Sequence, residues 1–288
     1  MKPNVECFFD EATFTATYLV REPEGSACAI IDPVLDFDYA SGRTSTSSVE
    51  RILEKVQQDH LQVEWVLDTH AHADHLSAAH YLREKLHCKI GIGAHITTVQ
   101  STFAQLYNES QQIPQDGSQF DHLFDDGETF FIGAMPVRVM HTPGHTPACL
   151  TYVVDDDAAF VGDTIFMPDY GSARCDFPGG SADTLYRSVQ RIFSLPDDTR
   201  IFVGHDYKAP GRDEFRWEST VGEEKARNIH MGNGRTQADF VALRQQRDAT
   251  LAMPKLILPA LQVNIRAGEL PPAEENGVAY LRIPLNAV

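Results

Sequence analysis

The residues with the strongest metal-binding character form one short block. Residues 69–75 read Thr-His-Ala-His-Ala-Asp-His, so that His70, His72, Asp74 and His75 fall within six residues. Imidazole and carboxylate groups are the ligands that zinc, iron and manganese take in proteins. A single histidine is more often a structurally paired or solvated side chain, but three at this spacing beside a carboxylate predict a metal site.

Three later segments also end in a histidine or an acid. His145 follows a Pro-Gly turn, Asp163 ends one apolar run, and His205 ends another. An acid at the end of a strand is more often a turn or cap residue, but beside two histidine clusters Asp163 becomes a candidate ligand. Ligands of α/β proteins bind outside the ends of strands, so we expect these side chains to share one rim.

The elements that must position these residues alternate along the chain. Apolar and β-branched runs predict strands over 13–20, 28–32, 63–67, 88–92, 128–133, 137–141, 149–154, 158–163 and 200–204. Helices are expected from Ser47, from near Asp74, over 95–108, over 183–194 and in two stretches past Gly222. Ser47 and Glu50 have the spacing of a capping box. Strands interspersed with helices predict a layered α/β sandwich.

Composition narrows the class of protein. A chain of 288 residues can bury a full core, and its formal net charge of −17 argues against nucleic acid as the main partner. No stretch approaches the roughly 20 apolar residues of a membrane span. Five cysteines without CxxC spacing indicate free thiols in a reducing compartment. Because acids stand where a signal peptide would be apolar, we expect a cytoplasmic protein without a membrane partner.

The order of the motifs resembles the metallo-β-lactamase superfamily. HxHxDH at 70–75 is followed by a lone histidine in Thr-Pro-Gly-His-Thr, then by Gly-Asp-Thr and by Gly-His-Asp. The resemblance covers about residues 10–210 and implies a four-layer αββα sandwich with the metal between two sheets. It implies a catalytic domain over 1–215, with residues 216–288 as a helical and extended C-terminal extension packed on the same domain.

The resemblance also implies ligand sets. In two-metal members of the superfamily, the positions that match His70, His72, His145 and Asp163 hold one metal. The positions that match Asp74, His75, Asp163 and His205 hold the other. Because the superfamily contains zinc hydrolases and iron dioxygenases, the fold alone leaves the reaction open.

The stretch after Asp163 is similar to the persulfide dioxygenases of this superfamily. Residues 171–180 carry an Arg-x-Asp-Phe pattern, although Cys175 stands where threonine is common. Residues 261–268 look like the bacterial second type of that group. The resemblance implies that glutathione persulfide and O2 are the substrates and that sulfite and glutathione are the products.

The persulfide dioxygenase resemblance implies one Fe(II), held by His72, His145 and Asp163 as a facial triad. His70, Asp74, His75 and His205 would then orient ligands and waters around that triad.

Glutathione carries two carboxylates, so a cation and a phenol are expected near the metal. Arg174 and Tyr207 are the candidates, and the alternative for Arg174 is a pairing with Asp176 or Asp169. Cys175 reads as a buried packing thiol, because nothing in the sequence supplies it with a base.

Two other functions remain open. A glyoxalase II-like thioester hydrolase with two Zn(II) ions would need seven ligands, and the chain has all of them. A metal-binding protein without turnover is the third alternative. An exported β-lactamase is disfavoured by the missing signal. The Pro- and Glu-rich tail either lies on the surface or reaches a neighbouring subunit, so a homo-oligomer stays among the alternatives.

Overall fold

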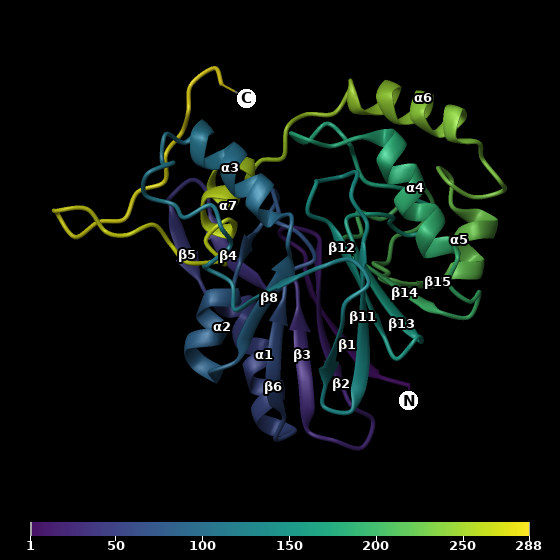
Figure 1. The fold of residues 1–288 in the computed structure, drawn as a ribbon, viewed down its shortest axis with the longest axis horizontal. Helices are drawn as coiled ribbons and strands as arrows, with labels where there is room; N and C mark the ends of the chain where they lie inside the picture. The colour runs from purple at the N-terminus through teal and green to yellow at the C-terminus, as the bar shows by residue number, and fades with distance from the viewer. Residues whose placement is uncertain (1, 288) are drawn as a thin grey trace.

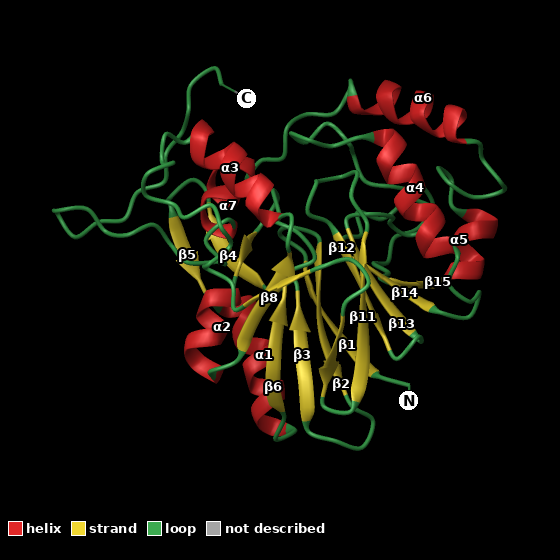
Figure 2. Cartoon of the chain, viewed as in Figure 1, coloured by secondary structure: helices red, strands yellow, loops and turns green. Residues whose placement is uncertain are grey.

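Two six-stranded sheets lie face to face at the centre of the molecule (Figures 1 and 2). The structure is a computed structural model that describes residues 2–287. The first sheet has the order β1 (Asn4–Asp10), β2 (Thr15–Arg21), β3 (Ala27–Ile31), β6 (Gln62–Leu67), β8 (Lys89–Gly93), β9 (His122–Phe124). The second has the order β10 (Thr129–Ile132), β11 (Met135–His141), β12 (Leu150–Val154), β13 (Ala158–Gly162), β14 (Arg200–Val203), β15 (Glu218–Thr220). A small third sheet joins β5 (Arg43–Ser45), β4 (Val34–Asp38) and β7 (Leu76–Ser77).

Parallel pairing aligns the strand ends that carry the candidate ligands. β3, β6 and β8 run parallel in the first sheet, and β13 runs parallel to β14 in the second. β3 is buried along its whole length, as expected of a parallel strand that is covered on both faces. The residues that follow β6, β13 and β14 therefore emerge at the carboxyl ends of central strands, where a ligand can reach them.

Three apolar clusters divide the core into layers. Between the sheets, Tyr18, Ile31 and Phe124 of the first sheet join the cluster of Tyr152 and Phe160 of the second. Outside the first sheet lie α1 (Ser47–Gln58), α2 (Ala79–Leu86), α3 (Ile96–Leu106) and α7 (Ile257–Asn264). Outside the second lie α4 (Ala182–Phe193), α5 (Val221–Arg227) and α6 (Gln237–Asp248). The predicted αββα sandwich is confirmed.

The C-terminal segment, residues 216–287, runs across both halves of the sandwich. It completes the edge of the second sheet with β15, which pairs with β14, and places α5 and α6 over that sheet. Residues 249–256 then lead to α7, which packs with the helices of the first sheet (Figure 1). The tail after α7 contains no helix or strand up to residue 287 and projects from the body.

Two local expectations are wrong. The helix expected from Asp74 begins five residues later, at Ala79, because Leu76 and Ser77 pair with β4 instead. The capping box at Ser47 does not form: Thr46 is the N-cap without a side-chain bond, and the Glu50 carboxylate accepts a hydrogen bond from the Tyr81 hydroxyl at 2.6 Å. Tertiary partners thus replace the local interactions that the sequence suggested.

The cysteines are thiols, as their spacing in the sequence indicated. All five cysteines are free. Burial raises the pKa of the Cys175 thiol, so it stays protonated as expected of a packing residue.

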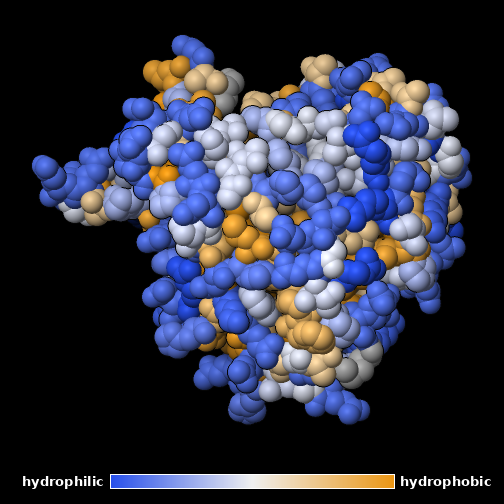
Figure 3. All heavy atoms as spheres, viewed as in Figure 1, coloured by the Kyte–Doolittle hydropathy of each residue, from blue (hydrophilic) through white to orange (hydrophobic). Residues whose placement is uncertain are grey.

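Over residues 2–287, the helices are too short and too polar to cross a membrane. Figure 3 shows a largely hydrophilic face with hydrophobic side chains gathered only in small patches.

Candidate metal centre

The ends of four strands bring seven histidine and aspartate side chains to one place. His70, His72, Asp74 and His75 follow β6, His145 follows β11, Asp163 follows β13 and His205 follows β14. All are buried except Asp74, which is partly exposed. The rim that the sequence predicted is therefore present, and it lies between the two sheets.

The ligand atoms form two groups. In the three-residue group, which is His70, His145 and Asp163, one ligand atom of each residue lies within 4.8 Å of the others. In the four-residue group, which is His72, Asp74, His75 and His205, the same limit holds.

Asp163 touches both groups with its two oxygens. Its Oδ2 lies 3.9 Å from Nε2 of His145, and its Oδ1 lies 3.4 Å from Nε2 of His205. One carboxylate therefore stands between two candidate metal positions.

The atoms that face the centre lack hydrogen bonds. Six buried atoms of residues 2–287 make no hydrogen bond, although His205 Nε2 lies within ion-pair distance of the two carboxylate oxygens among them; the six are His70 Nε2, His72 Nδ1, Asp74 Oδ2, His75 Nε2, Asp163 Oδ1 and His205 Nε2. A buried polar atom without a partner costs roughly 1–3 kcal/mol, so six in one place need an explanation. Divalent cations between them would satisfy all six, and the donor set of imidazole nitrogens and carboxylate oxygens fits zinc or iron.

The opposite ring nitrogens are held by the protein. His145 Nδ1 donates to the Arg174 carbonyl at 2.8 Å, and His205 Nδ1 donates to the Phe14 carbonyl at 3.1 Å. Because a carbonyl only accepts, these contacts place a proton on Nδ1 and turn Nε2 toward the centre, where Nε2 of His205 lies 3.0 Å from Oδ2 of Asp74.

His72 is oriented the other way round. Its Nε2 lies 3.0 Å from Oδ1 of Asp32, which leaves Nδ1 toward the centre. Asp32 is fixed in turn by the backbone N–H of Thr69 at 2.7 Å and by the Thr69 hydroxyl at 2.9 Å. Asp32 was not among the residues predicted from the sequence, and its position directly after a buried β-strand was the available signal.

The surroundings shift the pKa of His70 and His72 in one direction and that of His205 in the other. Burial lowers the pKa of His70 and of His72, and the neighbouring imidazoles lower it further, so both rings are neutral near pH 7. Burial by itself would lower the pKa of His205, but the carboxylates of Asp163 and Asp74 outweigh it and raise that pKa. For Asp74, burial is outweighed by the nearby imidazoles, so its pKa falls and it stays charged.

The expected triad of His72, His145 and Asp163 stays a prediction. His145 and Asp163 lie together, and by interatomic distance they group with His70. His72 groups with Asp74, His75 and His205, but its Nδ1 also faces the centre without a hydrogen bond, while Asp32 holds its Nε2. Both His70 and His72 therefore remain candidates for the third position of a triad.

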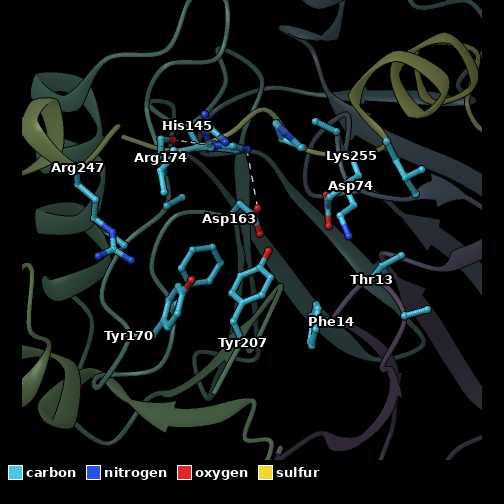
Figure 4. Close-up of a pocket in the computed structure, with 18 of the residues that line it drawn as sticks. Thr13, Phe14, Asp74, His145, Asp163, Tyr170, Arg174, Tyr207, Arg247 and Lys255 are labelled. Atoms are coloured by element: carbon cyan, nitrogen blue, oxygen red, sulfur yellow. Dashed lines mark hydrogen bonds and ion pairs between the residues drawn. The ribbon is translucent and has the colours of Figure 1, made fainter. Parts of the chain in front are cut away.

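A cavity of about 820 Å³ opens over the centre. Asp74, His145 and Asp163 lie at its base, aromatic rings such as Phe14 and Tyr170 line its walls, and Tyr207 belongs to it as well. Figure 4 shows the Tyr207 hydroxyl pointing toward Asp163. Burial raises the pKa of Tyr207, and the carboxylates of Asp74 and Asp163 raise it further, so the phenol remains a hydrogen-bond donor.

Arg174 lines the cavity but is already bound. Its guanidinium donates to both oxygens of Asp176, at 2.5 and 2.6 Å, and to the Ala252 carbonyl at 2.7 Å. The alternative pairing with Asp176 is therefore the observed one. Two cations that the sequence analysis missed, Arg247 and Lys255, also line the cavity. They stand in the C-terminal segment, where no motif pointed to the centre.

Comparison with known proteins places the fold and the motifs in a family. A sequence model of the metallo-beta-lactamase superfamily matches residues 11–205. The chain is 53% identical to a probable metallo-hydrolase of Burkholderia pseudomallei, with 99% of both chains covered. It is 46% identical to a protein of Dictyostelium discoideum named glyoxylase B2, covering 99% of this chain and 98% of that one. It spans 65% of the length of longer relatives named beta-lactamase hydrolase-like protein.

More distant relatives carry a different activity in their names. The chain is 30% identical to a mitochondrial persulfide dioxygenase of Bos taurus, covering 92% of this chain and 89% of that protein. The solved structure of ETHE1 from Myxococcus xanthus superposes with a TM-score of 0.73 at 30% identity, covering 92% of this chain and all of that one.

Proposed function

The chain belongs to the metallo-β-lactamase superfamily, and from this premise we propose that it is a persulfide dioxygenase with one Fe(II) per chain. The three-residue group carries the proposal, because two histidines and one carboxylate are the ligand set of non-haem iron oxygenases. The similarity to persulfide dioxygenases over nine-tenths of the chain supports it.

In this proposal His145 and Asp163 hold the iron together with one histidine of the 70–75 block: His72, as the resemblance implies, or His70, which groups with them by distance. When bound, the iron supplies redox chemistry and open coordination positions for O2 and a sulfur-bearing substrate. Glutathione persulfide and O2, with one water, become glutathione and sulfite: two oxygen atoms enter the outer sulfur, the S–S bond is hydrolysed, and glutathione leaves as the thiol. The chain's own groups around that chemistry are the Tyr207 phenol, which offers a proton at the cavity wall, and aromatic side chains, which exclude bulk water.

Arg247 and Lys255 are the proposed partners of the substrate carboxylates. Both are exposed, both line the cavity, and no carboxylate of residues 2–287 lies within 4.0 Å of either cation. Figure 4 shows them on different sides of the centre. A tripeptide with a carboxylate at each end and sulfur in the middle matches that arrangement, whereas the Arg174 guanidinium is committed to Asp176.

Replacing these cations tests the assignment of the substrate contacts. We expect Arg247→Gln and Lys255→Gln each to raise KM for glutathione persulfide by about tenfold, because each removes one charge-assisted hydrogen bond, and to leave kcat within about twofold. Lys85→Gln, on α2 and outside the cavity lining, is the matched control. An unchanged KM in both cavity variants would show that the carboxylates bind elsewhere.

The reaction is tested by metal analysis of the purified protein together with O2 uptake on glutathione persulfide. About one iron per chain, with O2 consumed and sulfite formed, is the expected result. Two zinc ions per chain, no O2 uptake and cleavage of a glutathione thioester would overturn the proposal.

The thioester hydrolase is the second candidate, and a specific observation favours it. The four-residue group also presents unpartnered atoms, and Asp163 faces both groups, so a second metal has ligands. The name of the Dictyostelium relative points the same way. His205→Ala separates the two functions: a two-zinc enzyme should lose one metal per chain, whereas the iron content of a one-iron enzyme should stay near one.

A further inference from the structure

The main-chain loop of residues 171–176 touches the metal centre through the Arg174 carbonyl. That oxygen accepts the Nδ1 proton of His145 at 2.8 Å. The contact sets which nitrogen of His145 faces the three-residue group. The loop itself has no regular secondary structure apart from one bridge at Ser172, so something else must hold the Arg174 carbonyl in place.

The C-terminal segment holds this loop from outside. Arg244, on α6, donates to the Ser172 carbonyl at 2.9 Å, and Asn228 donates to the Gly171 carbonyl at 2.9 Å. His230 Nδ1 accepts from the Ser172 backbone N–H at 2.9 Å. These contacts come from residues beyond 205, where the match to the superfamily model ends.

The decisive contact is made by Asp248, the last residue of α6. Its Oδ2 accepts a hydrogen bond from the Cys175 backbone N–H at 2.9 Å. The N–H of Cys175 and the carbonyl of Arg174 belong to the same peptide group, which is planar and rigid. Asp248 therefore binds one side of a planar group whose other side binds His145.

Asp248 is itself fixed by Arg244. The other carboxylate oxygen, Oδ1, accepts from Arg244 at 3.2 Å through Nε and at 2.5 Å through Nη2. The Arg244 side chain is 1% exposed and the Asp248 side chain 10% exposed, so the pair is shielded from solvent. The two oxygens of Asp248 thus have different partners, because Oδ1 binds Arg244 and Oδ2 binds the 174–175 peptide.

We propose that Asp248 is a positioning residue for His145 that acts through the 174–175 peptide group. A carboxylate on the N–H side polarises the peptide and makes its carbonyl a stronger acceptor, since linked hydrogen bonds reinforce one another. The carbonyl then orients the His145 ring and makes its Nε2 more basic, as a carboxylate does when it binds a metal-ligating histidine directly. The inference rests on His145 as a metal ligand in the proposed function, but it needs neither iron nor the dioxygenase reaction.

Cobalt(II) binding to the purified apoprotein tests this without turnover. We expect Asp248→Ala to weaken Co(II) binding by about tenfold and to shift the visible d–d bands, because loss of an outer partner of a metal ligand typically costs 10–100-fold. Asp248→Asn keeps an oxygen acceptor without the charge and should weaken binding by about threefold. A native dissociation constant and a native spectrum in both variants would overturn the proposal.

Two controls separate positioning from general loss of stability. Phe240→Leu, in the buried face of the same helix, should lower Tm but leave Co(II) affinity and spectrum unchanged. Gln246→Ala, at an exposed position on α6, should change none of these. If Phe240→Leu weakens Co(II) binding as much as Asp248→Ala, then Asp248 acts only through the stability of α6, and the proposal fails. If Asp248→Ala does not fold, Asp248→Asn decides the outcome.

Discussion

Two buried polar regions of this protein differ in whether their polar atoms have hydrogen-bond partners. In the metal centre, six nitrogen and oxygen atoms of the described residues have no hydrogen-bond partner. In the C-terminal polar network, which is Glu224, Asn228, His230, Arg244 and Asp248, each side chain is hydrogen-bonded. Both regions are largely buried, and they meet at the loop of residues 171–176.

The difference shows how to tell a ligand site from a structural network. Proteins rarely leave buried polar atoms without partners, so a cluster of such atoms marks the place where something else binds. A network in which every side chain is hydrogen-bonded needs no further ligand, and it fixes the backbone around it. Removing a residue from the first region should cost function, and removing one from the second should cost stability, except that Asp248 also supports His145 through the 174–175 peptide.

The largest expected effect comes from Asp163, which faces both ligand groups. Asp163→Ala should lower metal content to a trace and turnover by at least about 100-fold, more than the usual cost of losing an outer-sphere partner. The apoprotein should be at least as stable as the native apoprotein, because a buried carboxylate with an unpartnered oxygen has been removed. Metal content by mass spectrometry and Tm in the presence of chelator measure the two quantities.

Asp157→Asn is the matched control for Asp163→Ala. Asp157 pairs with Arg200, so this change should leave the metal content native. If Asp163→Ala lowers the Tm of the apoprotein markedly, the carboxylate is structural, and the distinction between the two regions weakens.

The second effect concerns Arg244 and falls on stability. Arg244→Met leaves the Ser172 carbonyl and the Asp248 carboxylate without their buried partner, so the free energy of unfolding should fall by about 3–5 kcal/mol. Urea unfolding of the apoprotein measures it. Arg247→Met, at an exposed position of the same helix, should change the free energy by less than about 0.5 kcal/mol. An equal fall in the free energy of unfolding in both variants would contradict the stabilising role assigned to the buried network.

The third effect is a pH dependence of stability that arises from Glu224 and develops only gradually across several pH units. Burial raises the pKa of Glu224 from 4.5 to about 8, although hydrogen bonds from Ser219 and Asn228 oppose the shift. Between these values the folded protein keeps a proton that the unfolded chain has released. The stabilisation from Glu224 is therefore complete below about pH 4.5 and is lost as pH rises through 8, with a slope of at most about 1.4 kcal/mol per pH unit.

Glu224→Gln should remove this slope, because a neutral amide keeps hydrogen-bonding capacity toward Ser219 and Asn228 without titrating. At pH 8 the variant should be more stable than the native protein, and near pH 5 the two should be similar. Urea unfolding across this range makes the comparison, and Glu223→Gln at the partly exposed neighbouring position of α5 serves as control. Parallel curves for native protein and Glu224→Gln would show that Glu224 is ionised in the fold.

Much of the fold was readable from local patterns. The apolar runs at 149–154 and 158–163 became β12 and β13, and the helix expected over 183–194 became α4, because each has a strong pattern and few competing partners. Short edge strands such as β5 and β15 were missed, since three residues carry too little periodicity to be recognised.

Residue type and spacing predicted the layered α/β class, the seven candidate ligands and their position at strand ends, because both are local properties of the chain. Contacts between distant segments set the orientation of the rings: Asp32, which follows a strand some 40 residues earlier, binds Nε2 of His72 and leaves its Nδ1 toward the centre, whereas His70 presents its Nε2. Contacts between distant segments also set the roles of Arg174, Arg247 and Asp248. Which cation is free, and which carboxylate supports a ligand, depends on contacts between segments far apart in the chain.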